Sequence, residues 1–235
     1  MPRRAAASRE QSHVIQIIQS HERDRPVVAE RCVGRQKIVK FTGSSDIQTG
    51  LIKEFPVGTF APANGFPVTF SIPKANTKKS PPKYNFWDDP TGQPLTVNVS
   101  VPKAKAVYTL MNAYSPAIGS TIATVEFKGS KGADQTFSLV AGTDIRDFCQ
   151  NFFANTINGT TTQTAFAVSN VQDACGTGNV HTGLISDYRV DEQQFTLSAA
   201  FAKQKLTQII ITPTGAGGSR PIVLGISVAT GGKAN

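Results

Sequence analysis

One short segment contains the residues of this chain best suited to binding a ligand. The segment YNFWDDP, between Pro82 and Pro90, includes Tyr84, Trp87 and Asp88. Sugars are recognised by flat aromatic faces that stack on the pyranose ring and by nearby carboxylates or amides that bind its hydroxyls. The segment therefore predicts one of two things: a carbohydrate-stacking platform, or a loop whose Trp side chain closes the end of a folded core.

Two further groups of polar residues are candidates for binding or for structure. Asn112 and Tyr114 come at the end of a predicted strand, where they either reach the same ligand or serve the fold. Arg146 stands close to Asp144 and Asp147. Because a guanidinium group matches a carboxylate in a bidentate pair, we predict that these three residues form a structural ion pair that holds a turn.

The cysteines predict no metal centre. Cys32, Cys149 and Cys175 form neither a CxxC pair nor a Cys/His cluster. Cys149 and Cys175 are spaced to close a loop of about 25 residues, which would stabilise the fold by about 3 kcal/mol, although two free thiols fit equally well. Calcium, held by Asp134 and the carbonyl groups of the GSKGAD turn, is the one cofactor that the sequence leaves open.

Catalytic signatures do not occur in the sequence. It has no GxSxG, no HExxH and no P-loop. Of its three histidines, His13 and His21 lie in the basic N-terminal part and His181 stands alone in a stretch rich in Gly and Asn. Neighbouring carboxylates such as Asp191 and Glu192 point apart in a strand, so they do not predict glycosidase geometry. We therefore expect a protein that is not an enzyme.

The net charge of +8 is unevenly distributed along the 235 residues. Residues 1–40 hold nine Lys/Arg and four Asp/Glu, residues 41–105 hold seven and four, and residues 106–235 hold eight of each. This distribution predicts a basic N-terminal extension, 1–40, either disordered or a short helix, followed by one β-sandwich domain, 41–230, and a tail, 231–235. A neutral sandwich disfavours nucleic acid as a partner.

Short apolar runs separated by Gly, Pro and Asn predict an all-β fold. LTVNVSV alternates and places Leu95, Val97, Val99 and Val101 on one face, and the nearly continuous apolar runs near the C-terminus suit strands that are covered on both faces. Residues between Phe148 and Asp191 are predicted to form a long loop that packs back on the sandwich. The predicted strands are Phe41 to Thr42, Leu51 to Phe55, Val68 to Ile72, Thr96 to Val101, Val107 to Asn112, Thr121 to Lys128, Asp134 to Val140, Phe195 to Leu197, Leu206 to Thr212 and Ile222 to Val228.

Four segments resemble, in order, the galactose-binding-like β-sandwich modules of bacterial secreted glycoside hydrolases and surface proteins. They are VYTLMNAYS, STIATVEFKGSKGADQTFSLVAGTDIRDF, DEQQFTLSAAFAKQKLTQIIITPTG and PIVLGISV. The resemblance covers roughly residues 66–230, includes the turn from Ile145 to Phe148, and departs from the modules that have Trp in place of Phe148. It implies a jelly-roll-type antiparallel sandwich, a non-catalytic carbohydrate-binding role and a secreted or cell-surface location.

Three functions remain as expectations, in order of preference. The first is a carbohydrate-binding module that contacts a glycan surface, and the second is a structural, adhesive or self-assembling surface protein. The sequence shows neither a clear signal peptide nor an apolar run long enough to span a membrane. The third is binding of nucleic acid or another anionic polymer through Lys74, Lys78, Lys79, Lys83, Lys103 and Lys105.

Overall fold

Antiparallel β-strands form the regular structure of the described residues, apart from one short 3₁₀ turn. The computed structural model describes residues 36–40, 55–74, 85–89, 91–149, 153–172, 185–215 and 218–231. They belong to the unit Cys32–Asn235, one of two into which the chain divides. The predicted all-β class is confirmed, and in these residues no helix is long and apolar enough to cross a bilayer.

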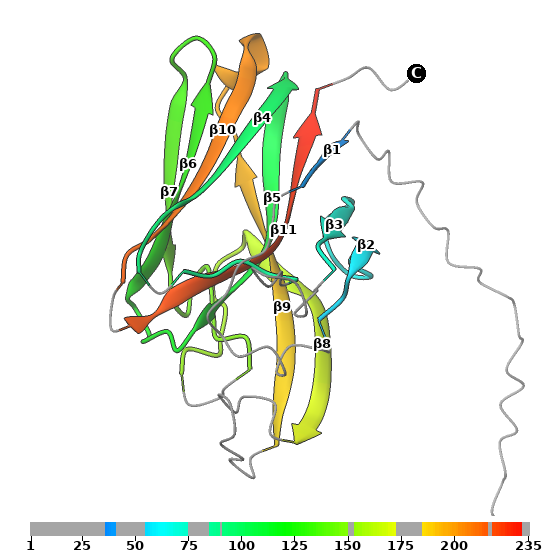
Figure 1. Cartoon of the computed structure of the whole chain (residues 1–235), viewed down its shortest axis with the longest axis vertical. Helices are drawn as coiled ribbons and strands as arrows, with labels where there is room; N and C mark the ends of the chain where they lie inside the picture. Colours follow the sequence, from blue (N-terminus) through cyan, green and yellow to red (C-terminus); the bar gives the residue numbers. More distant parts are fainter. Residues whose placement is uncertain are drawn as a thin grey trace, which may run out of the picture. The chain divides into compact units, whose positions relative to one another are not determined.

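Two large sheets make up the sandwich (Figure 1). The five-stranded sheet has the order β1-β11-β5-β9-β8, with β1 (Gln36–Val39), β5 (Ala104–Tyr114), β8 (Thr162–Gln172), β9 (Ile185–Thr196) and β11 (Arg220–Thr230). The four-stranded sheet has the order β4-β10-β6-β7, with β4 (Leu95–Pro102), β6 (Thr121–Gly129), β7 (Asp134–Val140) and β10 (Lys205–Pro213). A small hairpin pairs β2 (Gly58–Phe60) with β3 (Phe70–Ile72), and the 3₁₀ turn η1 (Phe201–Lys203) precedes β10.

The strands pair in a nested order. Leaving aside β2, β3 and β8, the first strand pairs with the last, β1 with β11, and the second with the second-last, β4 with β10. The next pair inward is β5 with β9, and the innermost is β6 with β7. One long antiparallel ribbon that wraps into two facing sheets in this way is a jelly roll. The predicted jelly-roll-type sandwich is therefore confirmed, with β8 added beside β9.

Apolar side chains fill the space between the two sheets. In β4, Leu95, Val97 and Val101 are buried and Val99 packs against the same cluster, while the alternate residues face solvent. The shared face predicted for these four residues is confirmed. Across the space they join Phe127 of β6 and apolar residues of β5, β10 and β11 in one core.

A second core covers the outer face of the five-stranded sheet. It contains aromatic residues from around the small hairpin, among them Phe55, Phe70 and Phe86, packed on the outward side chains of β5 and β11. β11 is buried over eight consecutive residues because its alternate side chains enter the two different cores. Gly225 of β11 lies at a break in register, and a Cβ there would meet Phe70 at 3.1 Å, so the glycine permits the close packing.

The main differences from the sequence prediction concern β1, β8 and β9. β1 lies in the part assigned to an N-terminal extension, yet all four of its residues pair with β11. The stretch expected to be a long loop contains β8 and most of β9, because buried polar residues there hide the apolar alternation that marks a strand. The expected strand at 41–42 lies outside the described residues, as does all of 51–55 except Phe55.

Candidate functional site

The loop 85–89, which includes two of the predicted binding residues, is held against the edge of β11. The backbone N–H and C=O groups of Trp87 and Val223 exchange two hydrogen bonds of 2.8 Å. The loop thus takes over the edge of β11 beyond the point where β1 ends, at Val39 opposite Ile226. Trp87 is 6% exposed and belongs to the core between the sheets. This position matches a Trp that closes the core, and it presents no exposed ring face on which a sugar could stack.

The next residue, Asp88, forms a buried ion pair with Arg220 at the start of β11. Arg220 Nε lies 2.7 Å from Asp88 Oδ2, and the Asp88 side chain is fully buried. The Arg220 guanidinium carbon lies 4.7 Å from the centre of the Tyr114 ring, and that ring stacks on Phe148 at 6.3 Å. The structure therefore brings Asp88 and Tyr114 close together, as a binding site would require. The contact between them runs through Arg220, however, and belongs to the folded interior.

The neighbouring acidic residue of the same loop, Asp89, organises a turn. Its Oδ1 atom accepts hydrogen bonds from the N–H and the hydroxyl of Thr91, and a longer one of 3.3 Å from Gln93 N–H. Partial burial acts to raise the pKa of Asp89, but these hydrogen bonds outweigh it and hold the pKa below its ordinary value. The two acidic residues of the loop thus both serve its conformation.

Asn112 lies where β5 and β9 separate. Their ladder ends at Leu110 opposite Glu192, and beyond this pair the fully buried Asn112 amide bridges the strands. Its Oδ1 accepts the Asp191 N–H at 2.8 Å, and its Nδ2 donates to Asp191 Oδ2 at 2.8 Å. An amide can replace the missing backbone hydrogen bonds because it carries both a donor and an acceptor.

Arg146 finds its carboxylate partner on a distant strand. It forms a bidentate pair with Asp191, at 2.8 Å from Nε and 2.7 Å from Nη2, and also donates to Thr164 Oγ1 and Asn155 O. Asp191 is fully buried, so the pair lies in a region of low dielectric. A charge without a partner would be costly there. The ion pair predicted for Arg146 exists, but with Asp191 in place of its sequence neighbours.

The two predicted partners, Asp144 and Asp147, bind backbone groups. Asp144 Oδ2 accepts the Val140 N–H at 3.0 Å and closes the turn after β7. Asp147 accepts the Ser115 N–H at 2.9 Å and the Cys149 N–H at 2.8 Å. Residues this close in sequence point in different directions along the chain, so the turn uses them separately. Their structural role agrees with the prediction, and the ion-pair partner assigned to Arg146 is corrected.

Glu192 is a buried acid for which the sequence predicted no role in a site. Its Oε2 accepts the Phe66 N–H at 2.8 Å, and the side chain is fully buried. Burial raises the pKa of Glu192 to about 7, although the hydrogen bonds from Phe66 and Gln163 act to lower it. A Cβ on Gly65 would meet the same oxygen at 2.3 Å, so the loop approaches this carboxyl group closely.

Several predicted residues have a different status in the structure. Cys149 is disulfide-bonded, while Cys175, its predicted partner, and Tyr84 lie outside the described residues. Asp134 is exposed at the first position of β7, and no group of three His, Cys, Asp or Glu suited to a metal ion occurs in the described ranges. The described residues thus add no carboxylate ligands for the calcium ion predicted at Asp134.

No family model matches this chain, and no curated protein matches its sequence. Sequence reasoning missed Arg220 and Asp191 as the partners that organise the polar residues, because both lie far along the chain from the residues that they bind. The one available signal was the unusual density of charged and amide residues in YRVDEQQ, between predicted apolar runs.

Proposed function

We propose that this chain is a structural protein that self-assembles through its jelly-roll sandwich, as the subunit of a protein shell. The observation that carries the proposal is the nested strand pairing, from β1 with β11 inward to β6 with β7. Jelly rolls with this connectivity occur in viral capsids, lectins and cupins.

The use of the polar and aromatic residues supports a scaffold over a sugar-binding site. Trp87 is in the core, the Tyr114 ring packs against Arg220 and Phe148, and Asp88 is paired with Arg220. In the described residues the large hydrophobic side chains that are exposed are Val57 and Ile118, and neither is aromatic. Trp87, Asp88 and Tyr114, which a lectin would present to a sugar, are here used to join the loops to the sheets.

Electron microscopy of the full chain tests this proposal. Negatively stained samples at rising protein concentration are expected to show particles of uniform size and regular outline. Imaging the same samples at high ionic strength distinguishes two kinds of assembly. Particles held together by apolar contacts persist in salt, whereas particles held together by charge dissociate. Single dispersed chains in all samples would contradict the proposal.

The second candidate is the secreted or cell-surface carbohydrate-binding module that the sequence resemblance implies. Its support is that resemblance together with Tyr84, which precedes the loop 85–89 in the sequence. A glycan panel probed with the full chain and with Tyr84→Ala tests it: binding that is lost in the variant would favour this function over self-assembly. Trp87→Ala is a poor probe because removing a core Trp costs about 3–5 kcal/mol of stability.

A further inference from the structure

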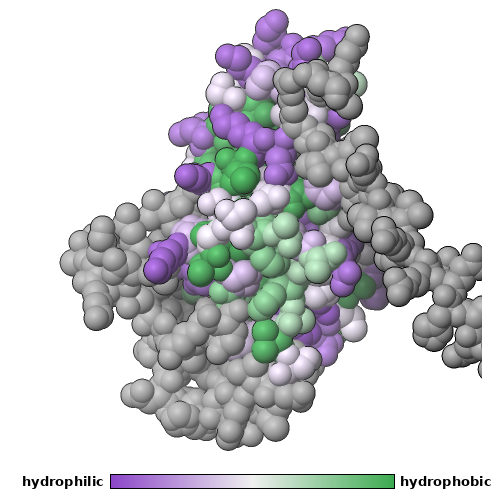
Figure 2. Space-filling view, turned by 90° about the vertical axis from the view of Figure 1, so that its right-hand side faces the viewer, coloured by the Kyte–Doolittle hydropathy of each residue, from purple (hydrophilic) through white to green (hydrophobic). Residues whose placement is uncertain are grey.

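Several exposed lysines gather at one end of the sandwich. The turn between β4 and β5, the hairpin between β6 and β7, and the segment from η1 to the start of β10 meet at the upper end of the molecule in Figure 1. Backbone hydrogen bonds join them: Lys103 N–H donates to Gln204 O at 3.3 Å, and Ser130 N–H donates to Lys205 O at 2.9 Å. In Figure 2, hydrophilic side chains gather at the upper end of the face shown, and hydrophobic ones lie further down.

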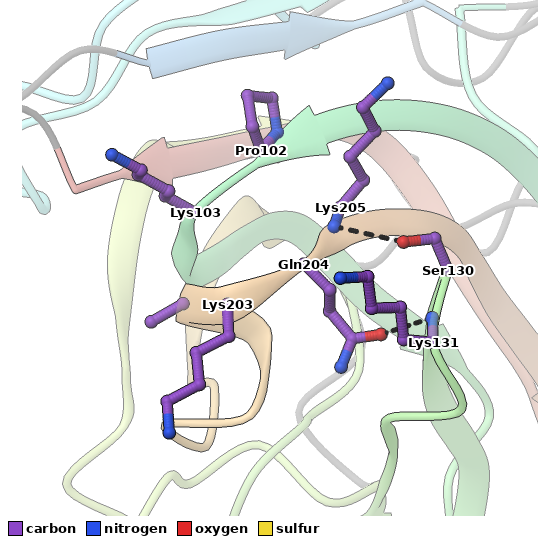
Figure 3. A pocket seen from close by; sticks show the side chains of 8 residues that line it. Pro102, Lys103, Ser130, Lys131, Lys203, Gln204 and Lys205 are labelled. Carbon is purple, nitrogen blue, oxygen red and sulfur yellow. Dashed lines mark hydrogen bonds between the residues drawn. The ribbon is translucent and has the colours of Figure 1, made fainter.

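These segments surround a pocket of about 550 Å³. Its described lining includes four lysines and no Asp or Glu: the residues are Pro102, Lys103, Ser130, Lys131, Ala202, Lys203, Gln204 and Lys205. Figure 3 shows the lysine side chains spreading in different directions from the three segments. Such an arrangement offers several separate positive charges to an extended anion instead of enclosing one small ion.

A polar framework holds the backbone of this pocket in place. Gln204 Oε1 accepts the Lys131 N–H at 2.6 Å, and Gln204 Nε2 donates to Ala200 O at 3.2 Å. Ser130 Oγ accepts the Lys205 N–H at 3.3 Å (Figure 3). The framework is built from a neutral amide and a hydroxyl, so it fixes the segments without a carboxylate that would neutralise the lysines.

The conformation of Lys103 adds a second observation. Its φ angle is 54°, in the left-handed region that favours glycine. A residue with a Cβ in this conformation costs about 1 kcal/mol or more relative to glycine. Strained positions of this kind cluster at functional sites, where the side chain matters more than the strain. Here the side chain supplies one of the four positive charges of the pocket lining.

We propose that this lysine pocket binds the phosphate backbone of a nucleic acid. Lysine ammonium groups are point charges that attract phosphates without reading the bases, and no aromatic ring lines the described pocket to stack a base. The expected binding is therefore independent of base sequence and depends strongly on salt.

The composition of the sequence that precedes β1 favours a nucleic acid over a small anion. Gln36, the first residue of β1, pairs with Ala229 of β11. The next residue of β11, Thr230, pairs with Ala104, which follows Lys103 in the chain. The 35 residues that precede Gln36 in the sequence contain seven Arg and four Asp/Glu. Basic N-terminal arms of this kind often bind nucleic acid. The sequence that precedes β1 is thus itself basic, as the pocket lining is.

Fluorescence anisotropy with a labelled oligothymidylate tests the proposal, using the full chain at concentrations where it is a single molecule. The pocket variant is Lys131→Gln, Lys203→Gln and Lys205→Gln together. The control variant, Lys37→Gln, Lys40→Gln and Lys128→Gln, removes the same charge from described positions outside the lining. The two variants have equal net charge, so a difference between them reports position.

The expected result is a loss of about tenfold or more in affinity at low salt for the pocket variant. Its slope of log K against log salt should fall by about 2, since each phosphate contact to a single strand contributes about 0.7. Equal binding by the pocket and control variants would overturn the proposal. So would tighter binding of a heparin oligosaccharide of the same charge, which would assign the pocket to sulfated glycans.

The single variant Lys131→Gln covers the case in which the triple variant fails to fold, and it should weaken binding in the same direction. Neither result depends on self-assembly, because binding is measured on the separate chain. Failure of the shell proposal and failure of the nucleic-acid proposal are therefore distinguishable.

Discussion

At the end of the sandwich where β5 finishes, charged side chains are buried and matched by specific partners, whereas at the end where β5 begins lysines are exposed around a pocket. Asp191 is enclosed by Arg146 and Asn112, and Asp88 by Arg220. Lys103, by contrast, lines an open pocket without a neighbouring carboxylate in its lining. We call these regions the paired end and the lysine end.

The difference shows how one fold separates buried charges that are paired from exposed charges that give a positive surface. Residues 106–235 hold equal numbers of acidic and basic residues, so their net charge is zero in the sequence. The fold places Asp147, Asp191 and Glu192 inside the protein, where they serve hydrogen bonds, and leaves Lys131, Lys203 and Lys205 outside. A segment that is neutral on average thus gives a locally positive surface.

The largest effect is expected at the paired end. Arg146→Ala leaves the Asp191 carboxylate buried without its bidentate partner, and breaking a buried pair on one side costs about 3–5 kcal/mol. Urea unfolding measures this loss. The double variant Arg146→Met and Asp191→Leu removes both charges and should recover much of the stability. A loss below about 1 kcal/mol for Arg146→Ala would show that the paired end does not depend on this contact.

Glu192 predicts how the stability of the paired end responds to pH. The folded chain holds the Glu192 proton up to about pH 7, while the ordinary pKa of the group is 4.5. Between these values the folded state binds more protons than the unfolded state, so stability falls as pH rises through this window. The full change amounts to about 3 kcal/mol, from about 1.4 kcal/mol for each pKa unit.

Glu192→Gln checks this expectation because glutamine keeps an oxygen that accepts the Phe66 N–H. Urea unfolding at a series of pH values should show the variant gaining stability relative to the original chain as pH rises from 4.5 to 7. Glu126→Gln removes a carboxylate from the surface and serves as the matched control. Parallel pH profiles for the original chain and Glu192→Gln would contradict the assignment.

A smaller effect of opposite sign is expected at the lysine end. Lys103→Gly relieves the positive φ angle and should raise the free energy of unfolding by about 1 kcal/mol. The same change should weaken oligonucleotide binding. Thermal unfolding and anisotropy on one preparation measure both. A gain in stability with undiminished binding would remove Lys103 from the proposed site.

The smallest effect on stability is expected from the pocket variant of Lys131, Lys203 and Lys205. These side chains are exposed, and surface substitutions of this kind stay within about 0.5 kcal/mol each. Unfolding in urea should therefore superimpose closely on that of the original chain. A clear destabilisation would mean that the lysine end also supports the fold, and the contrast between the two ends would be lost.

The sequence predicted the fold class and the clearest strands, because alternation in β4 and the turn between β6 and β7 are local signals. It did not predict β8 and most of β9. In β9 the buried residues include Arg189, Asp191 and Glu192, and a strand whose buried positions are charged has no apolar period to detect.

The site residues were harder to interpret than the fold. Asn112 and Asp88 were predicted to contact a ligand and Arg146 to pair with its sequence neighbours. In the structure their partners come from β9 and β11, which are distant in sequence. Charge counts along the chain could not reveal the lysine end either, since it combines lysines from three separate segments. Both features arise from tertiary pairing.

Sedimentation velocity of the full chain over a range of concentrations tests the central claim most directly. If the jelly roll is the subunit of a protein shell, the sedimentation coefficient should move from that of a single chain to one large, discrete species as concentration rises, with few intermediates. A single slow species at every concentration would contradict self-assembly and return the protein to the class of monomeric binding modules.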